Sequence, residues 1–296
     1  MDVDSQTWLA VASGADERAC AELALVLEAR AIPSRPERRG REWVLCVRPE
    51  DASAAAAELA SYRRENVRLR APAPPPQAIG TGGFGVVSFL AVLMIMAICV
   101  HELAFGVDWL AVGRMDADRM LAGEWWRTVT ALTLHVDTAH LLANAGFGAL
   151  FCYFLGRYLG GGVGWIAIVL AGTLGNALNG WLEAPGHLSI GASTAVFGAL
   201  GLLTAYTWRR GFPRGTSFRA RVAPVVAGIA LLAYTGTGGP NTDIGAHLTG
   251  FAMGFAIGFA VARAPLPTSM RVQIAAGLAA WLLVIGAWIW GIVAID

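Results

Sequence analysis

Four polar side chains stand inside otherwise apolar segments of this sequence, namely His140, Asn144, Ser193 and His247. A serine hydroxyl becomes a useful nucleophile when an adjacent base accepts its proton, and a neutral imidazole suits that task. His140 and Asn144 are four residues apart, so on a helix they share one face and could both donate hydrogen bonds to a developing oxyanion. These residue types indicate acyl-transfer chemistry, with Ser193 as the nucleophile and His247 as the base.

The segments that carry these residues have the length and composition of membrane spans. The chain has 296 residues, of which 56% are hydrophobic and 15% charged, and its mean hydropathy is +0.55. A bilayer core is crossed by about 20 apolar residues. We expect seven spans, at about residues 84–104, 139–156, 163–182, 190–208, 222–236, 243–262 and 273–294. The sequence therefore predicts an all-α polytopic membrane protein.

The four polar residues fall at a similar depth in the spans that carry them. The second, fourth and sixth spans run in the same direction, and each polar residue lies within about the first two turns of its span. In the sixth span, Gly250, Gly254 and Gly258 follow His247 along one face. Small residues let two membrane helices approach closely. We therefore expect this face to pack near Ser193 and to bring His247 within hydrogen-bonding reach of it.

Arginine placement predicts the orientation in the membrane. Three of the connecting loops contain arginine and no acidic residue, with arginines at 157, at 209, 210, 214, 219 and 221, and at 263 and 271. An excess of arginine marks cytoplasmic loops. We expect a multi-pass protein of the inner (plasma) membrane, with a cytoplasmic N-terminus and an extracytoplasmic C-terminus. The first residues lack a basic region followed by an apolar core, so no cleavable signal peptide is expected.

The first quarter of the chain is more charged and predicts a small cytoplasmic α/β domain over residues 1–72. Its pattern favours a ferredoxin-like β-α-β-α-β order. The expected strands cover about 8–13, 42–47 and 67–70, the helices cover 15–31 and 52–64, and an extra strand is expected around 35–41. A Pro/Gly linker at 73–83, a six-span core at 84–262 and a further span within 263–296 complete the expected organisation.

Several other functions are disfavoured by composition and motif context. A net charge of +1 argues against nucleic-acid binding, and the four cysteines form no CxxC pair. The glycine cluster at 80–85 matches GxGxxG, but it follows a proline-rich stretch and not a strand, so it does not indicate a dinucleotide site. His135 and His140 are five residues apart, which is poor helical spacing for two metal ligands. We expect no metal and no cofactor.

Residues 84–262 resemble the rhomboid family of intramembrane serine proteases. Gly191-Ala192-Ser193 matches the nucleophile motif of the family, and the segment from Ala246 to Gly250 matches its base motif. The stretch from His140 to Asn144 matches the HxxxN element. Further matches are His135, at the position of an upstream histidine, Trp126-Arg127 in the first loop, and Phe197, where an aromatic ring stacks on the catalytic histidine.

This resemblance implies a six-helix protease core with one extra C-terminal helix, which we expect to face lipid. It implies an endopeptidase with a Ser193–His247 dyad that cleaves single-span membrane proteins near the outer leaflet, with His140 and Asn144 stabilising the oxyanion. A catalytically inactive, client-binding relative is the main alternative, although the serine and the histidine are both present. A transporter is less favoured, because the polar residues cluster near one face and not at the midplane. Nothing in the sequence specifies an oligomeric state.

Overall fold

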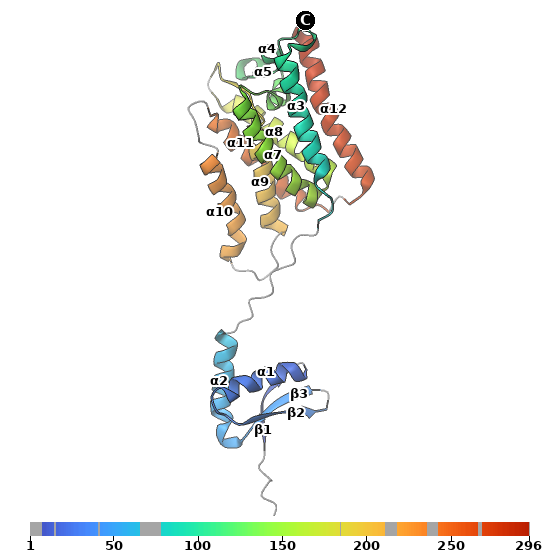
Figure 1. Cartoon of the computed structure of the whole chain (residues 1–296). Coiled ribbons are helices and arrows are strands. Elements are labelled where there is room, and N and C mark those ends of the chain that lie inside the picture. The colour runs from blue at the N-terminus through green and yellow to red at the C-terminus, as the bar shows by residue number, and fades with distance from the viewer. Residues whose placement is uncertain are drawn as a thin grey trace, which may run out of the picture. The chain divides into compact units, whose positions relative to one another are not determined.

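A computed structural model describes residues 8–14, 16–40, 42–65, 78–183, 185–210, 218–235, 242–265 and 268–295. The chain divides into two compact units, Met1–Pro72 and Ala73–Asp296. Both units are drawn in Figure 1.

The N-terminal unit is a small antiparallel sheet covered by two helices. Its elements are β1 (Leu9–Gly14), α1 (Glu17–Glu28), β2 (Ser34–Arg39), β3 (Glu42–Val47) and α2 (Ala52–Glu65), and the strand order is β1-β3-β2. Leu45 and Val47 of β3 pack with Leu27 of α1 and Leu59 of α2 in its core. This β-α-β-β-α order and strand order match the first five elements of a ferredoxin-like fold. The strand expected at 67–70 lies outside the described residues.

Seven longer helices of the second unit coincide with the seven expected spans. They are α3 (Gly83–His101), α7 (Thr138–Leu159), α8 (Gly161–Leu182), α9 (Ser193–Arg210), α10 (Phe218–Thr235), α11 (Ile244–Val261) and α12 (Met270–Ile295). By length and composition, five of the described helices could cross a membrane: α3, α7, α8, α11 and α12. In α10 only Val222–Thr235 forms a shorter apolar segment. The chain is a polytopic membrane protein, and the predicted number of spans stays a prediction.

The segment between α3 and α7 is folded into short elements. These are η2 (Ala104–Gly106), α4 (Trp109–Gly113), β4 (Met115–Asp116), α5 (Ala117–Leu121), α6 (Arg127–Thr130) and η3 (Ala131–Thr133). Strand β4 pairs with β5 (Leu188–Ser189), which lies just before α9. This pairing ties the first long loop to the segment that leads into Ser193.

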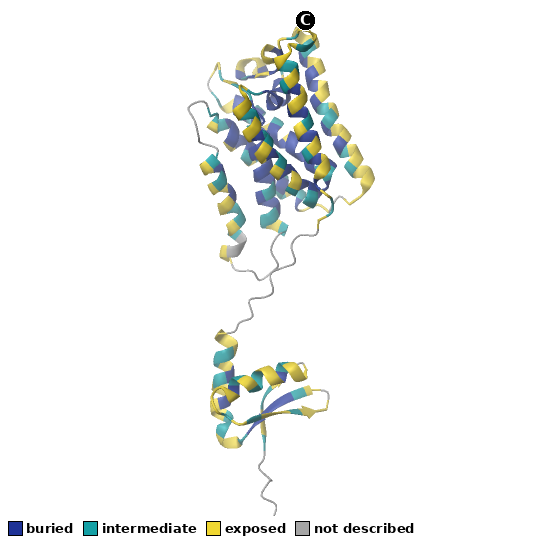
Figure 2. Ribbon diagram, in the orientation of Figure 1, coloured by how far each residue is buried: buried dark blue, intermediate teal, exposed yellow. Residues whose placement is uncertain are grey.

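Helices α8, α9 and α11 form the centre of the bundle, with α3 and α7 beside them. Helix α10 packs mainly against α9, and α12 packs against α8 and the short helices α4 and α6. Buried residues gather where the helices face one another, whereas outward faces of α3, α10 and α12 are exposed (Figure 2). Helix α12 therefore does more than face lipid, because one of its faces, which includes Trp288, is buried against the bundle.

Helices α9 and α11 approach so closely that glycine is required along their seam. A Cβ atom built on Gly250 would overlap the carbonyl oxygen of Thr194, and one on Gly254 would overlap that of Gly198. The same close approach recurs further along, where Gly258 meets Leu202. The close packing expected from the glycine spacing is thus present, and it sets His247 beside the first turns of α9.

Candidate functional site

A cavity of about 650 Å³ lies among α7, α9, α10 and α11, and the four polar residues singled out in the sequence all line it. His140 and Asn144 come from α7, Ser193 from α9 and His247 from α11. Other lining residues come from these four helices, from the segments that lead into them and from the loop after α4: Arg114, Asp137, Phe147, Phe151, Ser189, Phe197, Leu200, Leu231, Thr235 and Asp243. Residues that are far apart in the sequence are therefore brought to one hollow.

Ser193 is the first residue of α9, and the chain enters that helix through Gly191. Gly191 has φ +140°, a backbone conformation that residues with a side chain rarely adopt. A Cβ atom at this position would lie 2.7 Å from Cε1 of His140 and 3.6 Å from Oγ of Ser193. Glycine at 191 is therefore needed for backbone conformation and for space, and it leaves the His140 ring and the Ser193 hydroxyl on either side of one small gap.

His247 is held at the start of α11 with only 7% of its surface exposed. Asp243 begins this helix, and its Oδ1 accepts the backbone N–H of Ala246 at 2.9 Å, as expected for a helix cap. The ring of Phe197, one turn after Ser193, lies 4.3 Å from the His247 ring, with 39° between their planes. This contact fixes the imidazole against the first turn of α9, on the side where Ser193 lines the cavity.

Asn144 carries a buried hydrogen-bond donor that has no acceptor among the described residues. The residue is 6% exposed, and its Nδ2 is buried without a hydrogen-bond partner among the residues that the structure describes. Leaving a buried amide unpaired costs about 1–3 kcal/mol. An unpaired buried donor on the wall of a cavity is suited to a ligand oxygen that arrives from outside, such as an oxyanion.

His135 lies outside α7 and supports the segment that enters α9. Its Nε2 accepts the backbone N–H of Ala192 at 3.4 Å, and its ring meets the His140 ring edge-on at 5.1 Å. Burial, together with the neighbouring His140, lowers the pKa of His135 from its ordinary value of 6.5 to about 4. At neutral pH this imidazole is therefore uncharged and can act as the acceptor that the contact with Ala192 requires.

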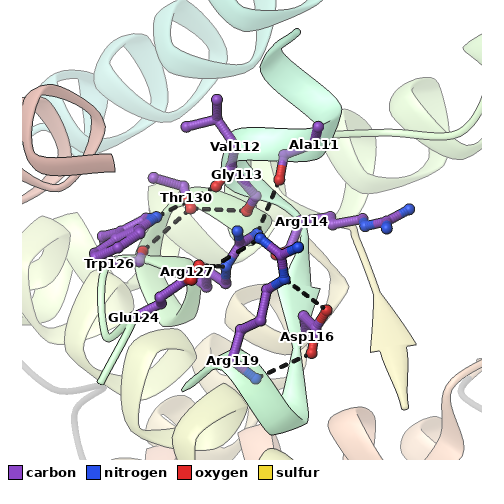
Figure 3. A network of polar contacts seen from close by, with 10 residues as sticks. All are labelled: Ala111, Val112, Gly113, Arg114, Asp116, Arg119, Glu124, Trp126, Arg127 and Thr130. Carbon is purple, nitrogen blue, oxygen red and sulfur yellow. Dashed lines mark hydrogen bonds and ion pairs between the residues drawn. The ribbon is translucent and has the colours of Figure 1, made fainter. Parts of the chain in front are cut away.

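Arg127 organises the loop between α3 and α7 from a fully buried position, with 0% exposure. Its Nε donates to the Glu124 carboxylate at 2.6 Å, and its Nη1 donates to the carbonyls of Ala111 and Arg114 at 3.0 and 2.9 Å (Figure 3). The neighbouring Trp126 donates from Nε1 to the carbonyl of Val112 at 3.2 Å. The Trp-Arg pair thus fastens α6 to α4, and neither residue lines the cavity described above.

The structure brings in two groups whose roles the sequence did not indicate. Trp288 of α12 donates to Oγ1 of Thr133 at 3.3 Å, two residues before His135. Nε2 of His187, in the short loop after α8, lies 2.8 Å from the Asp243 carboxylate. Three tryptophans in the last helix and a histidine in a short loop were visible in the sequence. No local pattern there specifies which face of a helix is buried or which loops meet.

Comparison with known proteins finds a family model that matches the central part of the chain. The model described as "Rhomboid domain" matches residues 122–264, which include all four polar residues of the cavity. The chain is 30% identical over 128 residues to "Putative rhomboid protease YdcA" of Bacillus subtilis (strain 168), covering 43% of this chain and 63% of that protein. It is 33% identical over 100 residues to "Rhomboid protease GluP" of the same strain, covering 32% of this chain and 18% of that protein. The chain thus spans less than two thirds of the length of these two curated relatives.

Proposed function

Because this chain belongs to the rhomboid family through its residues 122–264, we propose that it is an intramembrane serine endopeptidase with a Ser193–His247 dyad. The observation that carries the proposal is the cavity that both residues line together with Asn144, whose buried amide nitrogen has no hydrogen-bond partner among the described residues. A nucleophile, a base and an unused donor in one hollow are the parts that acyl transfer needs.

In the proposed reaction, Oγ of Ser193 attacks the scissile carbonyl while His247 accepts the hydroxyl proton. The negative charge that develops on the carbonyl oxygen is stabilised by His140, Asn144 and the backbone N–H of Ser193. His247 then returns the proton to the leaving amine, the C–N bond breaks, and an acyl-enzyme ester remains on Ser193. A water molecule, deprotonated by His247, hydrolyses this ester and releases the hydroxyl of Ser193.

The substrates we propose are single-span membrane proteins, cut near the outer leaflet. A membrane helix holds its peptide carbonyls in its own hydrogen bonds, because lipid offers no other partner. Attack by Ser193 therefore requires local unwinding, which glycine and proline favour, since they cost about 1–3 kcal/mol in a helix interior. We expect a span with such residues to be cut faster than the same span with leucine in their place.

The proposed arrangement is a six-helix core, α3 to α11, followed by α12, with the N-terminal unit on the cytoplasmic side. Support comes from arginine placement, since Arg209 and Arg210 lie in the last turn of α9 and Arg263 follows the end of α11. In this orientation, His140, Ser193 and His247 lie near the outer ends of their helices. Cysteine labelling in spheroplasts tests it: a residue introduced at Gly239 should react with an impermeant reagent, and one at Gly215 should not.

A fluorophosphonate probe on the purified full-length protein tests the proposed chemistry. We expect the wild type to be labelled, and Ser193→Ala and His247→Ala to lose both labelling and cleavage of a membrane reporter while remaining folded. Ser189→Ala is the matched control, because Ser189 lines the same cavity but is not the predicted nucleophile. Cleavage that persists in Ser193→Ala would refute the dyad, and an unlabelled, inactive wild type would favour the client-binding alternative.

A further inference from the structure

Three metal-ligating side chains meet at the start of α11, outside the proposed dyad. Glu183 follows the last residue of α8, His187 lies in the turn before β5, and Asp243 caps α11. One ligand atom from each of these residues lies within 4.8 Å of those of the other two. The cluster therefore joins three segments that are separate in the sequence, and two of them lead directly to Ser193 and His247.

The histidine of this cluster has a carboxylate near each of its ring nitrogens. Its Nε2 lies 2.8 Å from Oδ2 of Asp243, and its Nδ1 lies 3.9 Å from Oε2 of Glu183. Among the residues that the structure describes, no arginine pairs with Glu183 or Asp243, so His187 is the one basic group that the two carboxylates share. Two negative charges thus face at most one positive charge.

Further oxygen atoms converge beside the same residues. The amide Nδ2 of Asn179 donates to both carboxylate oxygens of Asp243, at 3.1 and 3.4 Å. Its other end, Oδ1, points to Gly245, where a Cβ atom would lie 2.5 Å from it and 3.4 Å from Oδ1 of Asp243, and would overlap Oε1 of Glu183. Three acceptor oxygens therefore gather on the free side of one glycine, an arrangement that a cation stabilises.

The donor set selects a class of ion. Zinc binds histidine nitrogen and carboxylate oxygen at about 2.0–2.2 Å, whereas calcium and magnesium prefer sites made of oxygen alone. Among common divalent ions at such nitrogen–oxygen sites, zinc is also bound tightly. The side chains of Glu183, His187 and Asp243 are 33%, 22% and 18% exposed, so an ion could reach them from solvent.

We propose that Glu183, His187 and Asp243 bind a Zn²⁺ ion, with Oδ1 of Asn179 beside them. Glu183 lies on the Nδ1 side of His187, so we expect its half-buried side chain to rotate toward an ion bound by Nε2 of His187 and by Asp243. The bound ion fastens the end of α8 to the turn before β5 and to the cap of α11. It thereby stabilises the two helix starts from which Ser193 and His247 project into the cavity.

The test is calorimetric titration of Zn²⁺ into the full-length, tag-free protein after treatment with a chelator. We expect one equivalent to bind to the wild type, and Glu183→Gln and His187→Ala to weaken binding by at least about tenfold. Neither substitution removes the Asp243 cap of α11. Glu102→Gln is the matched control, because Glu102 lies 3.7 Å from His101 in an exposed pair and belongs to no described three-residue cluster. Its affinity should equal that of the wild type.

Cobalt absorption separates this cluster from the four cysteines, since a nitrogen–oxygen site shows no thiolate charge-transfer band. Ser193→Ala should bind Zn²⁺ like the wild type, so the result is independent of the proposed protease activity. The proposal is overturned if the wild type binds no Zn²⁺, if Glu183→Gln and His187→Ala bind as tightly as the wild type, or if Co²⁺ gives a thiolate spectrum. The cluster would then be only an ion pair between His187 and its two carboxylates.

Discussion

The α9–α11 pair and α10 bound the same cavity in different ways. Along the seam between α9 and α11, glycines allow direct contact between the two backbones. Helix α10 packs mainly on α9, and several of its large side chains are exposed, such as Tyr234, which is 86% exposed. Its Leu231 and Thr235 nevertheless line the cavity.

This difference separates the groups that carry the proposed chemistry from the wall that bounds their space. Ser193 and His247 stand on the two helices that meet along the glycine seam, so their relative position is set by backbone contact. A change on α10 alters the shape of the cavity without moving either residue. We therefore expect substitutions on the seam to abolish activity and equivalent substitutions on α10 to change it modestly.

The largest effect is expected for Gly254→Ala in the seam. Its Cβ atom would overlap the carbonyl oxygen of Gly198, a backbone atom that cannot turn aside, so α9 and α11 must separate. Overpacking of this kind costs about 1–3 kcal/mol or more, and a displacement of about 1 Å at a catalytic site can cost a hundredfold in rate. We expect a lower thermal unfolding midpoint and loss of reporter cleavage. Gly286→Ala on α12 is the control, because its Cβ atom meets nothing within 4 Å. Equal unfolding midpoints and equal cleavage in the two variants would contradict the special role of the α9–α11 seam.

The Asn144→Ala variant tests whether α7 contributes a hydrogen-bond donor to the reaction or only lines the cavity. Removing one oxyanion donor lowers the rate by about 10²–10³. Because the Asn144 amide has no partner among the described residues, its removal should leave the unfolding midpoint unchanged or higher. Asn176→Ala provides the contrast: Nδ2 of Asn176 donates to the carbonyl of Thr128 at 3.0 Å, so this variant should lose stability. If Asn144→Ala is destabilised but cleaves the reporter at the normal rate, α7 only lines the cavity and takes no part in the reaction.

The pH dependence of stability tests whether the close packing of the α9–α11 seam extends into the loop before α9. Burial lowers the pKa of His135 from 6.5 to about 4, so the folded state favours the neutral imidazole. The corresponding stability is fully present above pH 6.5 and is lost as the pH falls toward 4, by up to about 3 kcal/mol. We expect His135→Gln, which can still accept from Ala192, to flatten the unfolding midpoint between pH 6.5 and 4. Parallel profiles for the two proteins would contradict the assignment.

The smallest effect is expected on α10, where Leu231→Ala should change cleavage by a few-fold at most. Leu231 lines the cavity but is only partly buried, so truncation removes little packing. Leu200 lines the same cavity from α9 and is only 5% exposed. Replacing such a buried leucine by alanine lowers the free energy of unfolding by about 2–5 kcal/mol. Thermal unfolding and reporter cleavage of both variants measure the difference. If Leu231→Ala is as damaging as Leu200→Ala, α10 is as tightly integrated as α9.

Features that depend on neighbouring residues in the chain were predictable from the sequence. The seven helices lie where the apolar runs predict them, because a bilayer length of apolar residues is a local property. The glycine stripe after His247 follows from helical spacing in the same way. In the N-terminal unit, local alternation predicted β1, β3 and the extra strand β2. The resemblance to the rhomboid family was confirmed, because its motifs are short and contiguous.

Only the tertiary structure decided which of these elements touch. The sequence did not indicate that α12 also buries one face against the bundle, with Trp288 against Thr133. The contact of His187 with Asp243 joins loops 56 residues apart. An all-apolar helix has no polar face to show which side turns inward, since lipid and protein interior are equally apolar. Its hydrophobic pattern therefore predicts that it spans the membrane, and only the shape of its neighbours determines what it packs against.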